Sequence, residues 1–98
     1  MPRINVSIDH ELSQKQARQR INASLLQFSQ SHQLTHHWSD DSSATFQASV
    51  RGGTVTGEIL MQNGCVDVTV KLPWTLALFA GQIKKQITKF GHEVLDAA

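Results

Sequence analysis

The sequence is poor in several features that would assign a small protein to a class. A single cysteine, Cys65, in 98 residues excludes an internal disulfide and gives no sign of an oxidising compartment. No stretch approaches the roughly twenty apolar residues that cross a bilayer, and residues 1–6 lack the apolar run of a signal peptide. Nine basic against eight acidic residues give a formal charge of +1, so the whole chain does not attract nucleic acid over long range. We expect one cytoplasmic domain over residues 1–98.

Patterns typical of catalysis or metal binding are also missing. His32, His36 and His37 lie close together in sequence, but adjacent residues of a strand point to opposite faces, so at most one of the last two could join a shared site. No second cysteine or carboxylate stands at ligand spacing. Cys65 has no base partner nearby, and Asp40-Asp41 fits a polar turn. We expect no enzymatic activity, no cofactor and no metal, with His36 partly buried and His37 in solvent.

The strongest periodic signal is near the C-terminus, where Pro73 ends a strand-like alternation and suits the first turn of a helix. Apolar residues then recur at steps of three and four, which predicts an amphipathic helix to about Asp96. They are Leu76, Phe79, Ala80, Ile83, Ile87, Phe90 and Val94. Trp74 and Leu78 fall beside or behind this stripe, so the first turns carry more apolar surface than one buried face needs. Gly91 weakens the helix by about 1 kcal/mol relative to alanine, and we expect its last turn to fray or bend.

The N-terminal half alternates in the way strands do, with one helix inserted. Residues 4–8 predict a first strand, and Ser13 with Gln16 has the spacing of a capping box, opening a helix that should end near residues 31–33. Further alternation predicts strands over about residues 34–38, 44–50, 54–62 and 66–72.

Two glycine positions add detail. Gly57 inside a strand suggests a bulge or the close approach of another element. Asn63-Gly64 is the preferred pair for a type I′ hairpin turn. The order β-α-β-β-β-β-α predicts an α+β fold, a two-layer sandwich of a mostly antiparallel five-stranded sheet with two helices on one face.

The pattern resembles a known family, the polyhydroxyalkanoic acid system proteins encoded near polyester storage genes in proteobacteria. The residues that carry the resemblance span almost the whole chain and are mainly structural. They are Ile4-x-Val6-x-Ile8-x-His10, Leu12, Ala17-Arg18, Trp38, Phe46, Gly53-x-x-x-Gly57-x-Ile59, Val66-x-Val68-x-Val70-x-Leu72-Pro73-Trp74 and Phe79-x-Gly81-x-Ile83-x-x-x-Ile87. The resemblance implies a cytoplasmic, non-enzymatic accessory protein connected with polyhydroxyalkanoate granules, and it supplies no catalytic residues.

The first functional interpretation is an accessory protein that contacts a polyhydroxyalkanoate granule, a granule protein or a second copy of this chain. An apolar anchor inside a basic rim is how such surfaces bind. The predicted contact residues are Trp74, Leu78, Lys84, Lys85 and Lys89. The alternative for Trp74 and Leu78 is that they cover the rim of the core.

A second interpretation is a nucleic-acid or ribosome-binding module that uses the basic helix faces, with Lys15, Arg18 and Arg20 on the first helix. Charged helix faces are usually only solvated, and nucleic-acid binding would also need interleaved aromatic residues. A third class, an enzyme or acyl carrier, needs a cavity between sheet and helices. We expect the inward residues to fill that space. A pocket lined by His36, Trp38 and Phe46 would instead support the enzyme or acyl-carrier interpretation.

Overall fold

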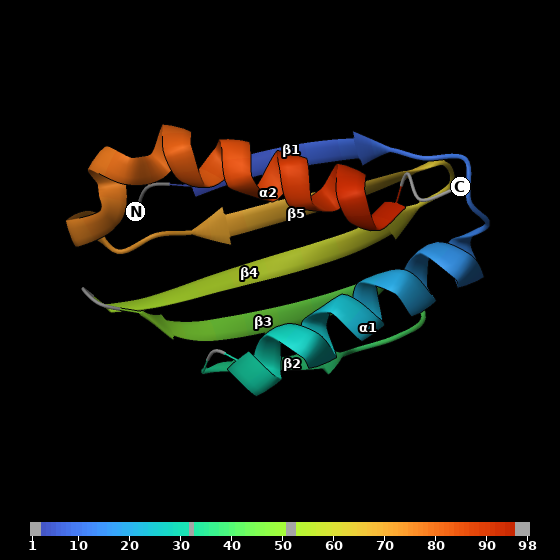
Figure 1. Ribbon diagram of the computed structural model, residues 1–98, viewed down its shortest axis with the longest axis horizontal. Helices are drawn as coiled ribbons and strands as arrows, with labels where there is room; N and C mark the ends of the chain where they lie inside the picture. The colour runs from blue at the N-terminus through green and yellow to red at the C-terminus, as the bar shows by residue number, and fades with distance from the viewer. Residues whose placement is uncertain (1–2, 32, 51–52, 96–98) are drawn as a thin grey trace.

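The computed structural model describes residues 3–31, 33–50 and 53–95. A five-stranded antiparallel sheet of order β1-β5-β4-β3-β2 carries two helices on one face (Figure 1). The elements are β1 (Arg3–Asp9), α1 (Gln14–Ser31), β2 (Leu34–Trp38), β3 (Ser43–Val50), β4 (Gly53–Gln62), β5 (Cys65–Lys71), the 3-10 helix η1 (Trp74–Phe79) and α2 (Ala80–Leu95). The predicted α+β class and element order are confirmed. Three predictions fall outside the described residues: the place of His32, the turn at residues 51–52 and the helix end at Asp96.

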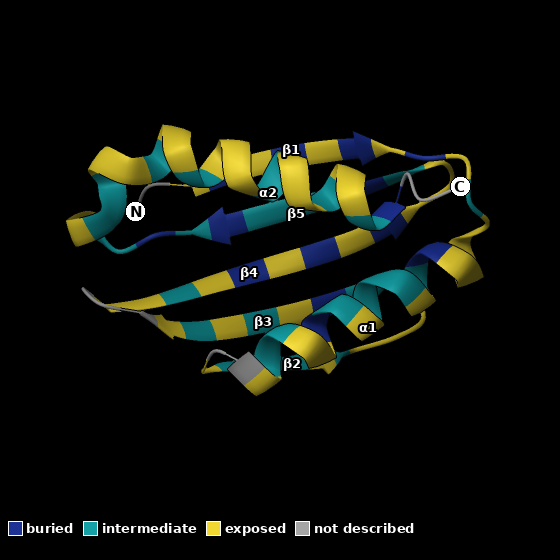
Figure 2. Ribbon diagram, viewed as in Figure 1, coloured by how far each residue is buried: buried dark blue, intermediate teal, exposed yellow. Residues whose placement is uncertain are grey.

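The two faces of the sheet differ because side chains alternate along each strand. Ile4, Val6 and Ile8 of β1 are buried toward the helices, and their register partners on β5 are Val70, Val68 and Val66. The opposite face is polar: the Asn5 side-chain amide donates a hydrogen bond to Thr69 Oγ1 at 2.8 Å. Figure 2 shows the resulting bands of buried and exposed residues along the strands. The core therefore lies on the helix side of the sheet.

Helix α1 begins at the predicted capping box. Ser13 Oγ accepts the Gln16 N–H at 3.1 Å, and Gln16 Oε1 accepts the Ser13 N–H at 3.3 Å. These two bonds satisfy backbone donors that the first turn of a helix leaves unpaired. Ala17, fully buried, and Leu25, nearly so, then anchor α1 to the core.

Two glycines let other groups approach the backbone closely. Gly57 on β4 pairs in register with Phe46 on β3, and the Phe46 ring covers the position that a Gly57 side chain would occupy. The predicted close approach is confirmed. Gly91 on α2 meets the Ile8 side chain in the same way. The expectation that the last turn frays after Gly91 is wrong as far as Leu95, because α2 continues to that residue, which is 3% exposed; a bend at Gly91 stays a prediction.

The hairpin between β4 and β5 sits where Asn63-Gly64 predicts it, but the turn type differs. Gln62 and Cys65 are register partners, which leaves a two-residue connection. Gly64 has a φ of +84°, while no non-glycine residue among those described has a positive φ. A type I′ turn needs positive φ at both central residues, so that assignment is wrong. Positive φ at the second residue alone is the pattern of a type II turn.

The closing helix also differs from the prediction, since it is not one continuous α-helix from Pro73. Residues 74–79 form the 3-10 helix η1, and the α-helix starts only at Ala80. A 3-10 helix has three residues per turn instead of 3.6, so the side chains of η1 point in other directions than an α-helix would give.

Replacing Gly64 by valine should destabilise the protein by about 1–3 kcal/mol, because a β-branched residue resists positive φ. Gly64→Asn is the control, since asparagine tolerates this region much better. Urea unfolding of both variants measures the difference. Equal stability of the valine and asparagine variants would contradict the turn geometry.

Two other glycines give opposite predictions for one substitution. Gly81→Ala adds a Cβ in open space on α2 and should stabilise by about 0.4–1 kcal/mol. Gly91→Ala places a Cβ against Ile8 and should destabilise by about 1–3 kcal/mol through overpacking, despite better helix propensity. Thermal unfolding checks both. A stabilising Gly91→Ala variant would mean that α2 does not lie against β1 as described.

Candidate functional site

The η1 helix projects two large apolar side chains into solvent. Pro73 precedes it in extended conformation, and the Pro73 carbonyl accepts the Leu76 N–H at 2.9 Å. Because side chains three apart align in a 3-10 helix, Leu76 and Phe79 share a side and line the space between helices and sheet. Trp74 is 75% exposed and Leu78 95% exposed. Covering the rim of the core is therefore the wrong interpretation of Trp74 and Leu78, whereas their role in binding stays a prediction.

The predicted lysines follow on α2, and Lys84, Lys85 and Lys89 are all exposed. Charge is segregated more than the net value suggests. Helices α1 and α2 hold six Lys or Arg residues and one acid, Glu93, a formal +5 that leaves −4 for the rest of the +1 chain. Helix N-termini favour acidic residues, yet α1 has none and carries Lys15 in its first turn. Helix stability does not explain this basic layer.

Two of the three basic residues on α1 have partners inside the molecule. The Arg18 guanidinium lies 4.4 Å from the centre of the Trp38 ring, a cation–π contact. Trp38 Nε1–H in turn donates to Asn22 Oδ1 at 2.9 Å. Arg20 Nη1 donates to the Val94 carbonyl near the end of α2, at 3.4 Å. The exposed basic residues therefore lie mainly on α2, which holds the three lysines predicted as contact residues.

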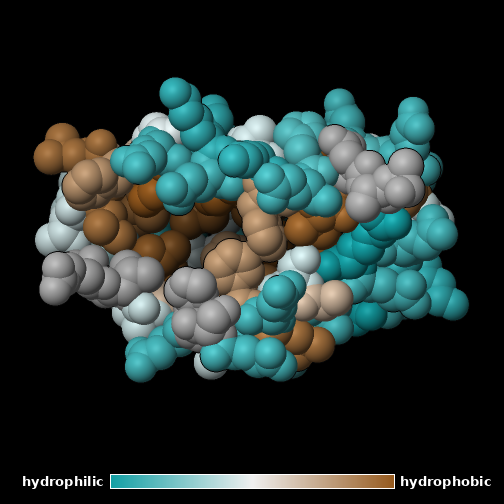
Figure 3. Space-filling view, in the orientation of Figure 1, coloured by the Kyte–Doolittle hydropathy of each residue, from teal (hydrophilic) through white to brown (hydrophobic). Residues whose placement is uncertain are grey.

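An open apolar cleft of about 860 Å³ lies between the two helices and the sheet. Figure 3 shows hydrophobic surface in this hollow, bordered by hydrophilic side chains along α2 and continuous with the hydrophobic end of the molecule at η1. The main lining residues are Ile21, Ser24, Leu25 and Phe28 of α1, Leu76 and Phe79 of η1, Ile83, Ile87, Phe90 and Val94 of α2, and Phe46, Ala48, Val55, Ile59, Val68 and Val70 of the sheet. The expectation that inward residues fill this space is wrong.

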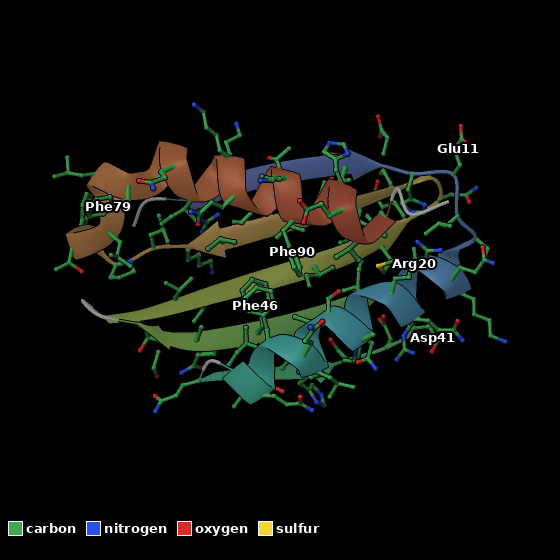
Figure 4. All side chains as sticks on the ribbon, viewed as in Figure 1. Glu11, Arg20, Asp41, Phe46, Phe79 and Phe90 are labelled. Atoms are coloured by element: carbon green, nitrogen blue, oxygen red, sulfur yellow. The ribbon has the colours of Figure 1, made fainter. Side chains whose placement is uncertain are left out.

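The two helices lie close together where Arg20, near the start of α1, reaches Val94, near the end of α2. Farther along both helices, Phe28 and Phe90 make an edge-to-face contact with ring centroids 4.9 Å apart. From the Arg20–Val94 end the helices diverge toward η1 (Figure 1), and the cleft stays open between them. Figure 4 shows Phe46 and Phe90 in the space between them and Phe79 beside η1. Phe79 and Phe90 therefore remain 51% and 39% exposed although they belong to the apolar stripe.

Sequence reasoning missed the polar groups at the rim of the cleft. Gln82 and Gln86 line it from α2, one turn apart. Ser24 lines it from α1 and donates its hydroxyl to the Arg20 carbonyl at 3.0 Å. The spacing of the two glutamines beside Ile83 and Ile87 was a signal that could have indicated them. Among the described residues, none of those that line the cleft has an ionisable side chain.

The other candidate groups have structural surroundings. His36 is half-buried and His37 exposed, as predicted, and no group of three or more potential metal ligands occurs within the described residues. Cys65 Sγ contacts Gln62 Oε1 at 3.4 Å. Asp40 Oδ1 accepts a hydrogen bond from the Ser42 N–H at 2.8 Å. This bond holds the pKa of the Asp40 carboxyl below its usual value, and Asp40 therefore stabilises the turn. Phe46 lines the cleft, but His36 and Trp38 do not.

Comparison with known proteins shows the family. A family profile described as "Putative polyhydroxyalkanoic acid system protein" matches residues 4–95, nearly all of the 98-residue chain. The chain belongs to this family, and the resemblance seen in the sequence is confirmed. No curated protein matches it. Among the described residues, no helix has the length and hydropathy required to span a membrane.

The open cleft changes the expected cost of core truncations. Ile4→Ala removes a side chain that is 4% exposed and should cost about 2–5 kcal/mol. Ile83→Ala, at a half-buried cleft wall, should cost less than that range, because no closed cavity forms. Urea unfolding compares the two. Equal losses would mean that the cleft is closed in solution.

Proposed function

We propose that the chain is a non-enzymatic accessory protein of the polyhydroxyalkanoic acid storage system that attaches to the surface of polymer granules through η1. The family assignment supports the connection with the storage system. The observation that carries the proposal is the exposure of Trp74 and Leu78, 75% and 95%, on one short segment. Fully burying such a side chain against an apolar surface contributes about 1.5–3 kcal/mol, so two together favour attachment strongly.

The lysines of α2 support the same surface. Lys84 and Lys85 lie in the second turn of α2, which follows η1 directly, and both are exposed, so a basic rim borders the apolar anchor. A polar rim around an apolar centre is the usual anatomy of a binding surface. The described residues that line the cleft carry no ionisable side chain, which supports a binding role over acid–base catalysis.

The alternative, a nucleic-acid-binding module, draws support from the basic helix layer. The two functions differ in salt dependence. Binding that neutralises six to ten phosphates weakens by about 10³–10⁵ between 50 and 200 mM salt, whereas attachment through apolar side chains does not depend on counterion release. A steep loss of binding with salt, together with retention on RNA, would favour the alternative.

A double variant, Trp74→Ala with Leu78→Ser, tests the attachment. Its affinity for amorphous polyhydroxyalkanoate particles should fall by more than about tenfold in co-sedimentation, since each lost contact is worth 1 kcal/mol or more. Its melting temperature should shift by less than about 4 °C, because both side chains lie in solvent.

The matched control is Leu26→Ser with Leu60→Ser, which removes two other exposed leucines, 48% and 43% exposed. This control should bind particles as the unaltered protein does. Unchanged binding by the Trp74 and Leu78 variant, or an equal loss in the control, would contradict the proposal.

A further inference from the structure

We propose that the cleft binds an aliphatic oligoester chain that ends in a carboxylate. This inference rests on the proposed function for its polyester chemistry and extends it by assigning a second site, separate from Trp74 and Leu78 of η1. Within the part of the chain that the structure describes, the cleft is lined by aliphatic and aromatic side chains, and its polar members are hydroxyl and amide groups. Its volume of about 860 Å³ lies within the range of about 300–1,000 Å³ for small-molecule sites. The body of its occupant must be uncharged, because a buried charge without a partner is costly.

Hydrogen bonding favours an ester over a peptide. The floor strands β3, β4 and β5 each pair with a neighbour on both sides, so their backbone groups are already used within the sheet. A peptide brings an N–H at nearly every residue, and each buried unpaired donor costs about 1–3 kcal/mol. An ester brings acceptors and no donor. The amide groups of Gln82 and Gln86 at the rim supply donors for such acceptors.

Charge favours an anionic chain end over a second copy of the protein. The helix layer carries a formal +5, and two copies meeting across their clefts would bring these like charges together. A carboxylate at the end of an apolar chain is instead attracted by this positive charge. With the chain in the cleft, its carboxylate lies in the positive field of α2, where Lys84, Lys85 and Lys89 are exposed.

The position of the cleft connects it to the proposed granule surface. Its walls include Leu76 and Phe79, which belong to the same short helix as Trp74 and Leu78. The helices diverge toward this end (Figure 1), so the cleft opens where η1 would rest on the polymer. A chain leaving the particle surface therefore meets the open end of the cleft, where Leu76 and Phe79 are apolar.

The test is calorimetric titration with a short, water-soluble 3-hydroxyalkanoate oligomer that has a free carboxylate. Ala48→Phe with Val68→Phe fills the floor of the cleft and should weaken binding by at least about tenfold. The control, Leu60→Phe, adds similar bulk at an exposed position that does not line the cleft and should bind normally. If the filled variant does not fold, Gln82→Glu with Gln86→Glu replaces exposed donors by anions and should give the same loss.

The outcomes separate this site from granule attachment. The Trp74→Ala, Leu78→Ser variant should keep oligomer binding while losing particle attachment, and the filled variant should do the reverse. No binding of the oligomer, or equal binding by the filled and unaltered proteins, would overturn the assignment. So would tighter binding of a simple fatty acid of equal length, which lacks esters, or a cleft occupied by a second copy, seen as a dimer that the oligomer does not dissociate.

Discussion

The contact between Gly91 of α2 and Ile8 of β1 fixes much of this structure. Because a helix with no side chain at that point can approach the strand closely, α2 lies over the β1 and β5 side of the sheet. Helix α1 is held over the other side, with Ala17 and Leu25 in the core and Trp38 bonded to Asn22. Five strands spaced about 4.8 Å apart make a sheet wider than a pair of close-packed helices 8–10 Å apart covers. The strip between the helices therefore stays open where they diverge.

Sequence patterns predicted the parts of the fold that depend only on which side of a helix or strand its side chains occupy. Alternation in residues 4–8 and the stripe of Ile83, Ile87 and Val94 state which side of each element faces the sheet, and the Ser13 capping box states where α1 begins. These predictions are confirmed. Distance between elements is not encoded in such patterns. Phe79 and Phe90 have the spacing of core residues but line an open cleft, because periodicity does not say how far α1 lies from α2.

Sequence patterns also did not predict the local backbone geometry in two places. The Asn63-Gly64 pair indicated a tight hairpin, yet only Gly64 has positive φ, since both turn types accept glycine at the second position. The 3-10 helix after Pro73 interrupts a pattern that an α-helix would satisfy equally well. Leu78 is 95% exposed on this segment, and the sequence predicted the outward direction of that residue from an α-helical pattern.

The proposed function assigns the exposed anchor, the basic helix layer and the apolar cleft of this small α+β protein to contact with the polymer. Its most direct test uses the fact that the chain has two tryptophans, one in solvent at η1 and one packed under Arg18. In a Trp38→Phe variant, the fluorescence of Trp74 should shift to the blue when amorphous polyhydroxyalkanoate particles are added, because the indole leaves water for an apolar surface. In the matched Trp74→Phe variant, the emission of Trp38 should not change. An unchanged Trp74 emission on particles that bind the protein would contradict the account.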